Sequence, residues 1–147
     1  MRISAKTRYG LSVMISIAQK YNTGEIITVI SLSEKLKISK IYLEQVFSLL
    51  KRADLVISVK GSQGGYRLAK DPKKITAYDI VYSIENALFE KTAETVLEKS
   101  PAIEKTMQDV FEKIDGNIKQ TLEKITLANL VSESEKNSSQ DGYMFYL

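Results

Sequence analysis

Residues 29–68 read VISLSEKLKISKIYLEQVFSLLKRADLVISVKGSQGGYRL, and the spacing of their apolar residues decides the fold class. Steps of three and four predict a helix over 29–36 and a second helix over 40–53. Ser39 stands between them, where its hydroxyl can cap the free backbone N–H groups of the second helix. Two short helices joined by a tight turn indicate a helix-turn-helix. The second helix is expected to bury Leu43, Val46, Phe47, Leu50 and Ala53.

Two short strands are expected next, at 56–59 and 66–68, because these runs are rich in β-branched or aromatic residues. Residues 60–65 between them are polar and rich in glycine, which is typical of a hairpin with a flexible tip. Thr76 can cap a further helix over 77–87. This order predicts a mainly α-helical fold with a small β-hairpin wing, the winged helix-turn-helix.

Two further helices are expected on either side of this unit. One runs over 4–21 and is ended by Gly24. The other runs from Pro101 to about residue 122 and carries an apolar stripe of about five turns. No other apolar segment is long enough to cover this stripe, so we expect it to pair with its own copy in a two-fold dimer. Packing of the stripe onto the winged domain is the alternative. The expected dimer interface consists of Met107, Val110, Phe111, Ile114 and Ile118.

The 147-residue chain is 44% hydrophobic and 27% charged, which is ordinary for a folded protein of this length. We expect a winged domain at 1–88, a linker loop and dimerisation helix at 89–131, and a tail at 132–147. Residues 132–141 are almost entirely polar, a composition that predicts a flexible tether. The tether presents an apolar end, which is unusual at an exposed terminus. That end consists of Tyr143, Met144, Phe145, Tyr146 and Leu147.

The chain contains no cysteine and no histidine, which excludes several classes of function. No disulfide, thiolate metal site or cysteine nucleophile can form, and no imidazole is present for acid–base catalysis. No apolar run approaches the ~20 residues that a membrane-spanning helix needs. We therefore expect a cytoplasmic protein that is not an enzyme and that needs no metal or other cofactor.

Charge is distributed unevenly along the chain. Residues 1–74 hold 14 Lys or Arg and 5 Asp or Glu, a net charge of +9. Residues 75–147 hold 7 Lys or Arg and 13 Asp or Glu, a net charge of −6. A basic half that contains a helix-turn-helix indicates binding to double-stranded DNA. Chance segregation of charge on a solvated surface is the alternative.

In this architecture the second helix of the helix-turn-helix enters the major groove, with its first residues over the base edges. Lys, Gln and Glu side chains there can pair with guanine, adenine and cytosine respectively. We expect the hairpin tip to reach a minor groove or phosphates, and the basic start of the chain to hold phosphates. The expected DNA-binding residues are Arg2, Lys6, Arg8, Ser39, Lys40, Tyr42, Glu44, Gln45, Lys60, Gly61, Ser62 and Gln63.

Four runs, at 8–11 (RYGL), 42–45 (YLEQ), 60–68 (KGSQGGYRL) and 75–80 (ITAYDI), resemble a bacterial repressor family that includes IscR, NsrR and CymR. The resemblance covers residues 1 to about 90 and implies a winged-helix homodimer that reads a near-palindromic operator. Many members hold an iron–sulfur cluster with three cysteines just before the dimerisation helix. This chain has no cysteine there, so it resembles a branch of the family without a cluster.

The tail at 143–147 resembles that of the CymR-like repressors of cysteine metabolism in this family. The resemblance implies a repressor of cysteine and sulfur metabolism genes, with cysteine synthase as a co-regulator that captures the C-terminal peptide. In such capture, backbone donors hold the terminal carboxylate while aromatic side chains fill the approach. Leu147 stands where isoleucine would match the accepted tails, a swap that costs under ~1.5 kcal/mol in a packed pocket.

Two positions inside the helix-turn-helix region depart from the family pattern. Lys37 in the turn and Asp54 after the second helix stand where relatives usually have glycine. A left-handed backbone at Lys37 would cost ~1 kcal/mol, whereas aspartate tolerates this conformation better than most residues.

Three other functions fit parts of the sequence. The same DNA-binding fold can sense a small molecule directly, in a pocket between the long helix and the winged domain. An adaptor that binds only proteins would explain the tail but would leave the basic half without a purpose. An enzyme fits least, because the sequence shows no nucleophile–base pair, metal cluster or cofactor fingerprint.

Overall fold

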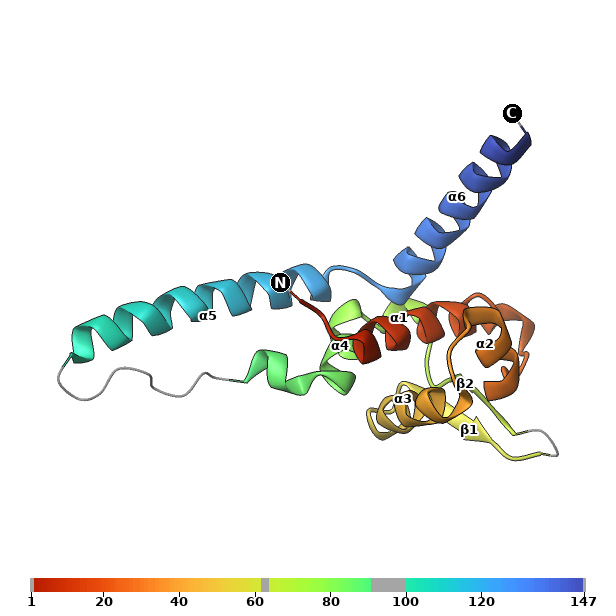
Figure 1. Cartoon of the computed structure of the whole chain (residues 1–147), viewed down its shortest axis with the longest axis horizontal. Coiled ribbons are helices and arrows are strands. Elements are labelled where there is room, and N and C mark those ends of the chain that lie inside the picture. The colour runs from red at the N-terminus through yellow and green to blue at the C-terminus, as the bar shows by residue number, and fades with distance from the viewer. Residues whose placement is uncertain (1, 62–63, 91–99, 147) are drawn as a thin grey trace.

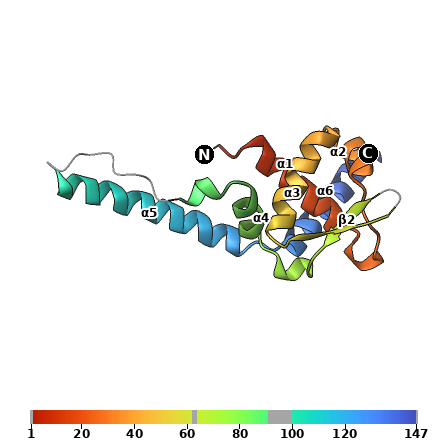
Figure 2. The ribbon, with the colours of Figure 1, turned by 90° about the horizontal axis from the view of Figure 1, so that it is seen from below.

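The computed structural model describes residues 2–61, 64–90 and 100–146, and the side chains of those residues up to 140. Its elements in chain order are α1 (Ala5–Ala18), the 3₁₀-helix η1 (Tyr21–Thr23), α2 (Val29–Leu36), α3 (Lys40–Arg52), β1 (Val56–Val59), β2 (Gly65–Leu68), η2 (Pro72–Lys74), α4 (Ala77–Ile84), η3 (Asn86–Phe89), α5 (Pro101–Glu123) and α6 (Leu127–Tyr146). Helices α1 to α4 and the hairpin form a winged domain, from which α5 and α6 extend in different directions (Figure 1). Figure 2 shows the same domain from below, with the hairpin on one side and α5 projecting from the other. The fold predicted from the helical and strand periodicity is therefore confirmed.

Hydroxyl side chains set the starts of the helices. The Ser39 Oγ accepts from the backbone N–H of Tyr42 at 3.2 Å, and Thr28 caps α2 in the same way. At the start of α4, Thr76 and Asp79 cap each other's backbone N–H groups, at 3.1 and 2.9 Å. Each cap satisfies an N–H group that the helix itself leaves without a partner. The caps expected at Ser39 and Thr76 are thus confirmed.

The core lies where one face of α1 meets α3, α4 and the hairpin. Val13 and Met14 of α1 are fully buried there. Gly10 lets α1 approach α4 closely, because a Cβ at this position would clash with the side chain of Ile84. The core predicted on α3 is confirmed except for Ala53, which is exposed because it is the C-cap, where the chain leaves the helix. The buried residues of α3 are Leu43, Val46, Phe47 and Leu50.

Lys37 and Asp54 both adopt the left-handed backbone conformation, with φ of 58°. Lys37 turns the chain from α2 toward α3, and packing around the turn holds it in place. The Ser33 hydroxyl donates to the carbonyl of Ile38 at 2.6 Å, and the Ile38 side chain is buried. A Cβ in this backbone region costs about 1–2 kcal/mol, so the strain expected at Lys37 is present in the fold.

The wing is an antiparallel hairpin whose register pairs Ser58 with Tyr66. The Tyr66 ring stacks on Phe47 of α3, with ring centroids 4.0 Å apart and planes 7° apart. The Tyr66 backbone also exchanges two hydrogen bonds with Ile27, at 2.8 and 3.0 Å. Gly65 permits this approach, because a Cβ there would press on the Ile27 carbonyl oxygen, 2.8 Å away. The hairpin is thus fixed both to α3 and to the segment before α2.

Helix α4 ends three residues earlier than predicted. It stops at Ile84, and η3 follows, which leaves Ala87 exposed rather than on a buried face. The chain leaves the helix at Glu85, whose carboxylate accepts a hydrogen bond from the start of α1. Phe89 of η3 packs edge-on against Tyr78, with ring centroids 5.0 Å apart. Of the loop predicted at 89–100, residues 91–99 lie outside the described residues.

Helix α6 takes the place of the predicted tether. Residues 132–141 lie within one continuous helix, so the prediction that they are unstructured is wrong. Thr126 and Asn129 cap each other's backbone N–H groups at the start of α6, and Leu127 is fully buried against the winged domain. Once this first turn is formed, each further residue adds a backbone hydrogen bond at little cost, even where its side chain stays in water. The side chains of 143–146, and Leu147 as a whole, lie outside the described part of the chain.

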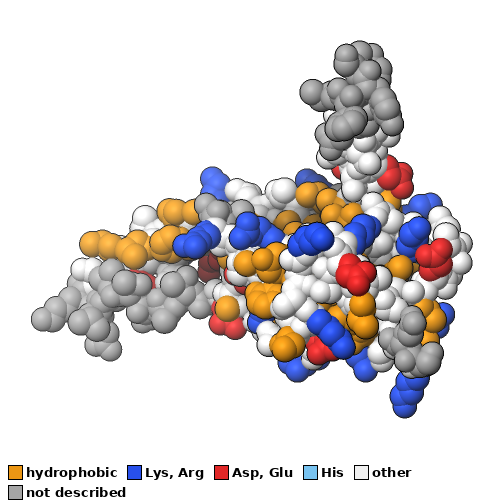
Figure 3. All heavy atoms as spheres, turned by 45° about the vertical axis from the view of Figure 1, so that its right-hand side comes forward, with side chains coloured by type: hydrophobic (Ala, Val, Ile, Leu, Met, Phe, Trp, Pro, Cys, Tyr) orange, Lys and Arg blue, Asp and Glu red, His pale blue; other side chains and the backbone are white. Residues whose placement is uncertain are grey.

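Helix α5 carries the predicted apolar stripe. Val110, Phe111 and Ile114 remain 44–53% exposed, and Figure 3 shows hydrophobic side chains in a row along the projecting helix. Nearer its C-terminal end α5 lies against α4, where the Lys119 ammonium sits 5.3 Å from the centre of the Tyr78 ring. The middle of the stripe is therefore left uncovered by the described part of this chain.

Replacing Lys37 by glycine is expected to stabilise the protein by about 1 kcal/mol, because glycine adopts the left-handed conformation without a Cβ penalty. Lys37→Ala is the matched control, since it removes the same charge and side chain but keeps the Cβ. Urea unfolding, with all proteins at the same concentration, measures the free energy of unfolding of the wild type and of both variants. A Lys37→Ala protein as stable as Lys37→Gly would show that the gain comes from the lost charge instead.

Candidate nucleic-acid interface

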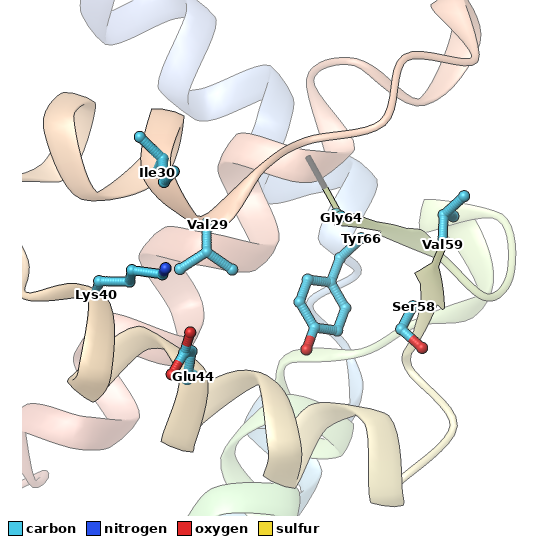
Figure 4. Close-up of a pocket in the computed structure, with 9 residues that line it drawn as sticks. Val29, Ile30, Lys40, Glu44, Ser58, Val59, Gly64 and Tyr66 are labelled. Atoms are coloured by element: carbon cyan, nitrogen blue, oxygen red, sulfur yellow. The ribbon is translucent and has the colours of Figure 1, made fainter. Parts of the chain in front are cut away.

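A hollow of about 440 Å³ lies between α2, α3 and the hairpin (Figure 4). Lys40 and Glu44 border it from α3, and Ser58 and Tyr66 border it from the hairpin. The start of α2 forms the third wall. Charged and polar residues from α3 and the hairpin therefore line one open space. Donors and acceptors around an open hollow suit a ligand with a polar edge, such as a nucleic-acid backbone.

Ser58 and Tyr66 were not among the residues expected in a DNA-binding site. The signal that identifies them is the alternation of side chains along a strand. Ser58 lies two residues after the buried Val56, on the same face of β1, and is itself exposed. Tyr66 is its cross-strand partner. The strand register is needed to place Ser58 opposite Tyr66. The sequence of the hairpin tip does not reveal this register.

A second hollow, also of about 440 Å³, lies on the outer face of α3. Lys6 of α1 borders it, together with Gln45 and Ser48 of α3. Gln45 and Ser48 are exposed, whereas Lys6 is half-buried. A cation from α1 thus stands beside the polar face of α3, where it can hold a phosphate while α3 contacts bases.

The position of Lys6 depends on Glu85 at the end of α4. The Glu85 carboxylate accepts from the Thr7 hydroxyl at 2.8 Å and from the Ser4 hydroxyl at 3.3 Å. Thr7 is fully buried, so this contact joins α4 to α1 inside the domain. A carboxylate at the start of a helix also interacts favourably with the helix dipole. The first turn of α1, and Lys6 with it, is therefore held relative to the rest of the winged domain.

The remaining expected residues differ in what they are free to do. The Ser39 hydroxyl caps α3, and the half-buried Tyr42 packs edge-on against Tyr9 with ring centroids 5.3 Å apart, so both help to position the helix. The other described residues of the expected set lie exposed at the chain start, on α3 and at the hairpin tip. These are Arg2, Arg8, Lys40, Glu44, Gln45, Lys60 and Gly61. Ser62 and Gln63 lie outside the described residues.

Two further features bear on the chemistry of the described residues. Among them, no group of three or more acidic, histidine or cysteine side chains is placed to hold a metal ion. None of the helices in that part of the chain is long and apolar enough to cross a membrane. The polar face of α3, the hairpin and the start of α1 remain as the candidate site.

The sequence matches a known family of regulators. The model of the Rrf2 family, described as iron-dependent transcriptional regulators, matches residues 3–133. The chain belongs to the Rrf2 family. It is 35% identical over 147 residues to the HTH-type transcriptional regulator CymR of Bacillus subtilis, with all of both chains covered. It is also 36% identical over 88 residues to IscR of Klebsiella pneumoniae, which is 60% of this chain and 53% of that protein.

Solved structures of the same family superpose on most of this Rrf2 chain. CymR of B. subtilis, described as the global cysteine regulator of that organism, matches with a TM-score of 0.74 and 34% identity, over 90% of this chain and 98% of the other. IscR of T. potens matches with a TM-score of 0.75 and 33% identity, over 99% and 97% of the two chains. This Rrf2 protein is therefore a CymR-like DNA-binding transcriptional regulator and not an enzyme.

The iron dependence in the description of the family does not fit this member. The chain contains no cysteine or histidine at any position, so it cannot bind an iron–sulfur cluster through either side chain. The described Asp and Glu residues form no group of three or more that could hold a metal ion. We therefore assign no role to iron in this protein.

We expect the affinity for DNA to fall steeply as salt rises, because Lys and Arg release counterions when they bind phosphates. Lys60→Ala should weaken binding to every sequence and lower the salt slope by about one. Gln45→Ala should instead relax the preference at one base pair, at a cost of about 1–3 kcal/mol. Fluorescence anisotropy over a salt series, with a selected duplex and a random duplex of equal length, measures both effects.

Lys136→Ala is the control for these variants. It removes the same charge from an exposed residue of α6, which extends away from α3 (Figure 1). Its binding should match that of the wild type. The interface is contradicted if binding does not depend on salt, or if Lys136→Ala loses as much affinity as Lys60→Ala.

Proposed function

We propose that this chain is a homodimeric repressor of cysteine and sulfur metabolism genes, acting in the cytoplasm with cysteine synthase as its co-regulator. The observation that carries the proposal is the likeness to the cysteine regulator CymR, which is 35% identical over all 147 residues and whose structure matches 90% of this chain. Binding of the purified protein to promoters of cysteine-metabolism genes, compared with unrelated promoters of the same genome, tests the assignment of its targets. Equal affinity for the two sets of promoters would contradict the proposed targets.

The proposed mode of DNA binding follows from the two hollows beside α3. Helix α3 enters the major groove with Lys40, Glu44 and Gln45 over the bases. The hairpin tip with Lys60 lies along the neighbouring backbone or minor groove, and Lys6 holds a phosphate on the other side of α3. In this mode the phosphate contacts of Lys6 and the hairpin fix the orientation of the protein, whereas the base contacts of α3 select the DNA sequence.

Exposure of the α5 stripe supports the proposed dimer. Phe111 and Ile114 are 44% and 48% exposed although they lie in the middle of a regular helix. Burying such side chains against a second copy removes apolar surface from water, at about 25 cal/mol for each Å². Two winged domains held by paired α5 helices would present two copies of α3 to a palindromic operator.

A charge placed in this stripe should break the dimer. Ile114→Glu would bury an unpaired carboxylate between the helices, at a cost of several kcal/mol. Gln120→Glu is the matched control, because it adds the same charge to an exposed position of α5 outside the stripe. Sedimentation equilibrium at micromolar concentration should give a dimer for the wild type and the control and a monomer for Ile114→Glu. A monomeric wild type would overturn the proposed dimer and the palindromic operator with it.

The direction of α6 supports the proposed role of the tail. Its first turn is anchored by the buried Leu127, whereas its C-terminal end stands clear of every other element (Figure 1). The last turn of a helix has carbonyl groups without intrahelical partners, so opening it costs little. A partner that takes an extended C-terminal peptide can therefore unwind the last residues without disturbing the core.

Deleting Tyr146 and Leu147 should abolish binding to purified cysteine synthase, because the free carboxylate and the terminal side chains leave together. Amidation of the terminus should weaken binding by removing the charge that the backbone donors hold. A peptide of the last ten residues should compete with the full chain for the enzyme and inhibit its turnover. Calorimetry with the full-length protein, the truncated protein and the peptide measures these effects.

The same truncation should leave the melting temperature, the dimer and DNA binding without the enzyme nearly unchanged, because the deleted residues are remote from the core and from α3. A fall of many degrees in the melting temperature, together with persistent enzyme binding, would mean that the tail serves the fold. The proposed partner would then be withdrawn.

A further inference from the structure

Ile41 is the second residue of α3, and its side chain is 72% exposed. This is the largest exposure among the exposed large hydrophobic side chains of the described residues. Isoleucine at this place does not serve the core, which α3 reaches through its opposite face. Nor does it favour the helix, because a β-branched side chain loses rotamer freedom there. The folded chain therefore does not use this exposed apolar group for its own packing.

The neighbours of Ile41 place it at the proposed DNA surface. It borders the outer hollow of α3, whose other lining residues are Lys6, Glu44, Gln45, Ser48 and Leu49. Ile41 and Gln45 are four residues apart, so they lie one above the other on the same side of the helix. Lys6 brings a positive charge to the edge of this row. An apolar group thus stands beside a base-reading amide and a phosphate-binding cation.

The major groove offers few apolar partners to such a side chain. Guanine, cytosine and adenine present hydrogen-bond donors and acceptors there, and thymine adds its C5 methyl group. Phosphates and sugars on the rim are polar. We propose that Ile41 is a specificity-determining residue that selects thymine by packing on this methyl group. The inference rests on the proposed DNA-binding mode of α3.

The position of this thymine relative to the base read by Gln45 follows from the helix. Four residues of α-helix rise about 6 Å, and successive base pairs are about 3.4 Å apart. We expect the thymine methyl within about two base pairs of the position that Gln45 reads, once in each half-site of the operator.

Replacing thymine by uracil tests the assignment, because it removes the C5 methyl and leaves every hydrogen-bonding group in place. The wild type first selects its duplex from a random library. Each thymine of that duplex is then changed to uracil in turn, and the affinity is measured. One position in each half-site should lose about three- to tenfold in affinity, the effect of losing one buried methyl contact.

The same uracil series is measured with two variants. Ile41→Ala should bind the thymine and uracil duplexes equally at that position, whereas Gln45→Ala should keep the wild-type sensitivity to uracil there. The melting temperature of Ile41→Ala should equal or slightly exceed that of the wild type, because Ile41 lies outside the core and alanine favours a helix more than isoleucine does. Sensitivity to uracil that persists in Ile41→Ala, or that is found at no thymine, overturns the inference while sequence-specific binding stands. A wild type that selects no sequence overturns the proposed function itself.

Discussion

The stack of Tyr66 on Phe47 is the contact on which the surface proposed to bind DNA depends. Phe47 belongs to the buried side of α3, and Tyr66 belongs to the hairpin, so a ring separation of 4.0 Å holds the wing against α3. The two backbone hydrogen bonds between Tyr66 and Ile27 add the segment that leads into α2. Three elements that are separate in sequence are thereby held around one hollow. These contacts together set the spacing between Lys40, Glu44 and the hairpin, which the proposed fit to a groove of DNA requires.

A second constraint keeps the two ends of the molecule independent. Glu85 joins the start of α1 to the end of α4 within the winged domain, and Leu127 anchors α6 on the same domain. Helices α5 and α6 then leave the domain in different directions (Figure 1). This arrangement separates the surface proposed to bind DNA from the stripe proposed to pair with a second copy, and from the C-terminal end. One small domain can therefore carry three contacts without one blocking another.

Much of the fold followed from the sequence because its strongest signals are local. Apolar spacing and the Ser39 cap placed the helix-turn-helix, and the Thr76 cap placed the start of α4. The left-handed turn at Lys37 was expected from the family pattern. The tail was misjudged because composition says little about a polar segment that continues a helix already nucleated by a buried residue. The role of Ser58 and Tyr66 also required tertiary information, since strand register decides which side chains face α3. The individual DNA contacts stay predictions, because exposure on one face does not reveal which groups meet bases.

The central claim is that the outer face of α3 lies in the major groove of each half-site. Because the natural chain has no cysteine, a single introduced cysteine can carry an iron chelate that cleaves nearby DNA. With the label at Ser48→Cys, the account predicts two clusters of cleavage inside the selected operator, separated by about one helical turn or a multiple of it. With the label at Lys136→Cys on α6, the account predicts no cleavage inside the operator. Cleavage directed from α6 but not from Ser48 would contradict the account.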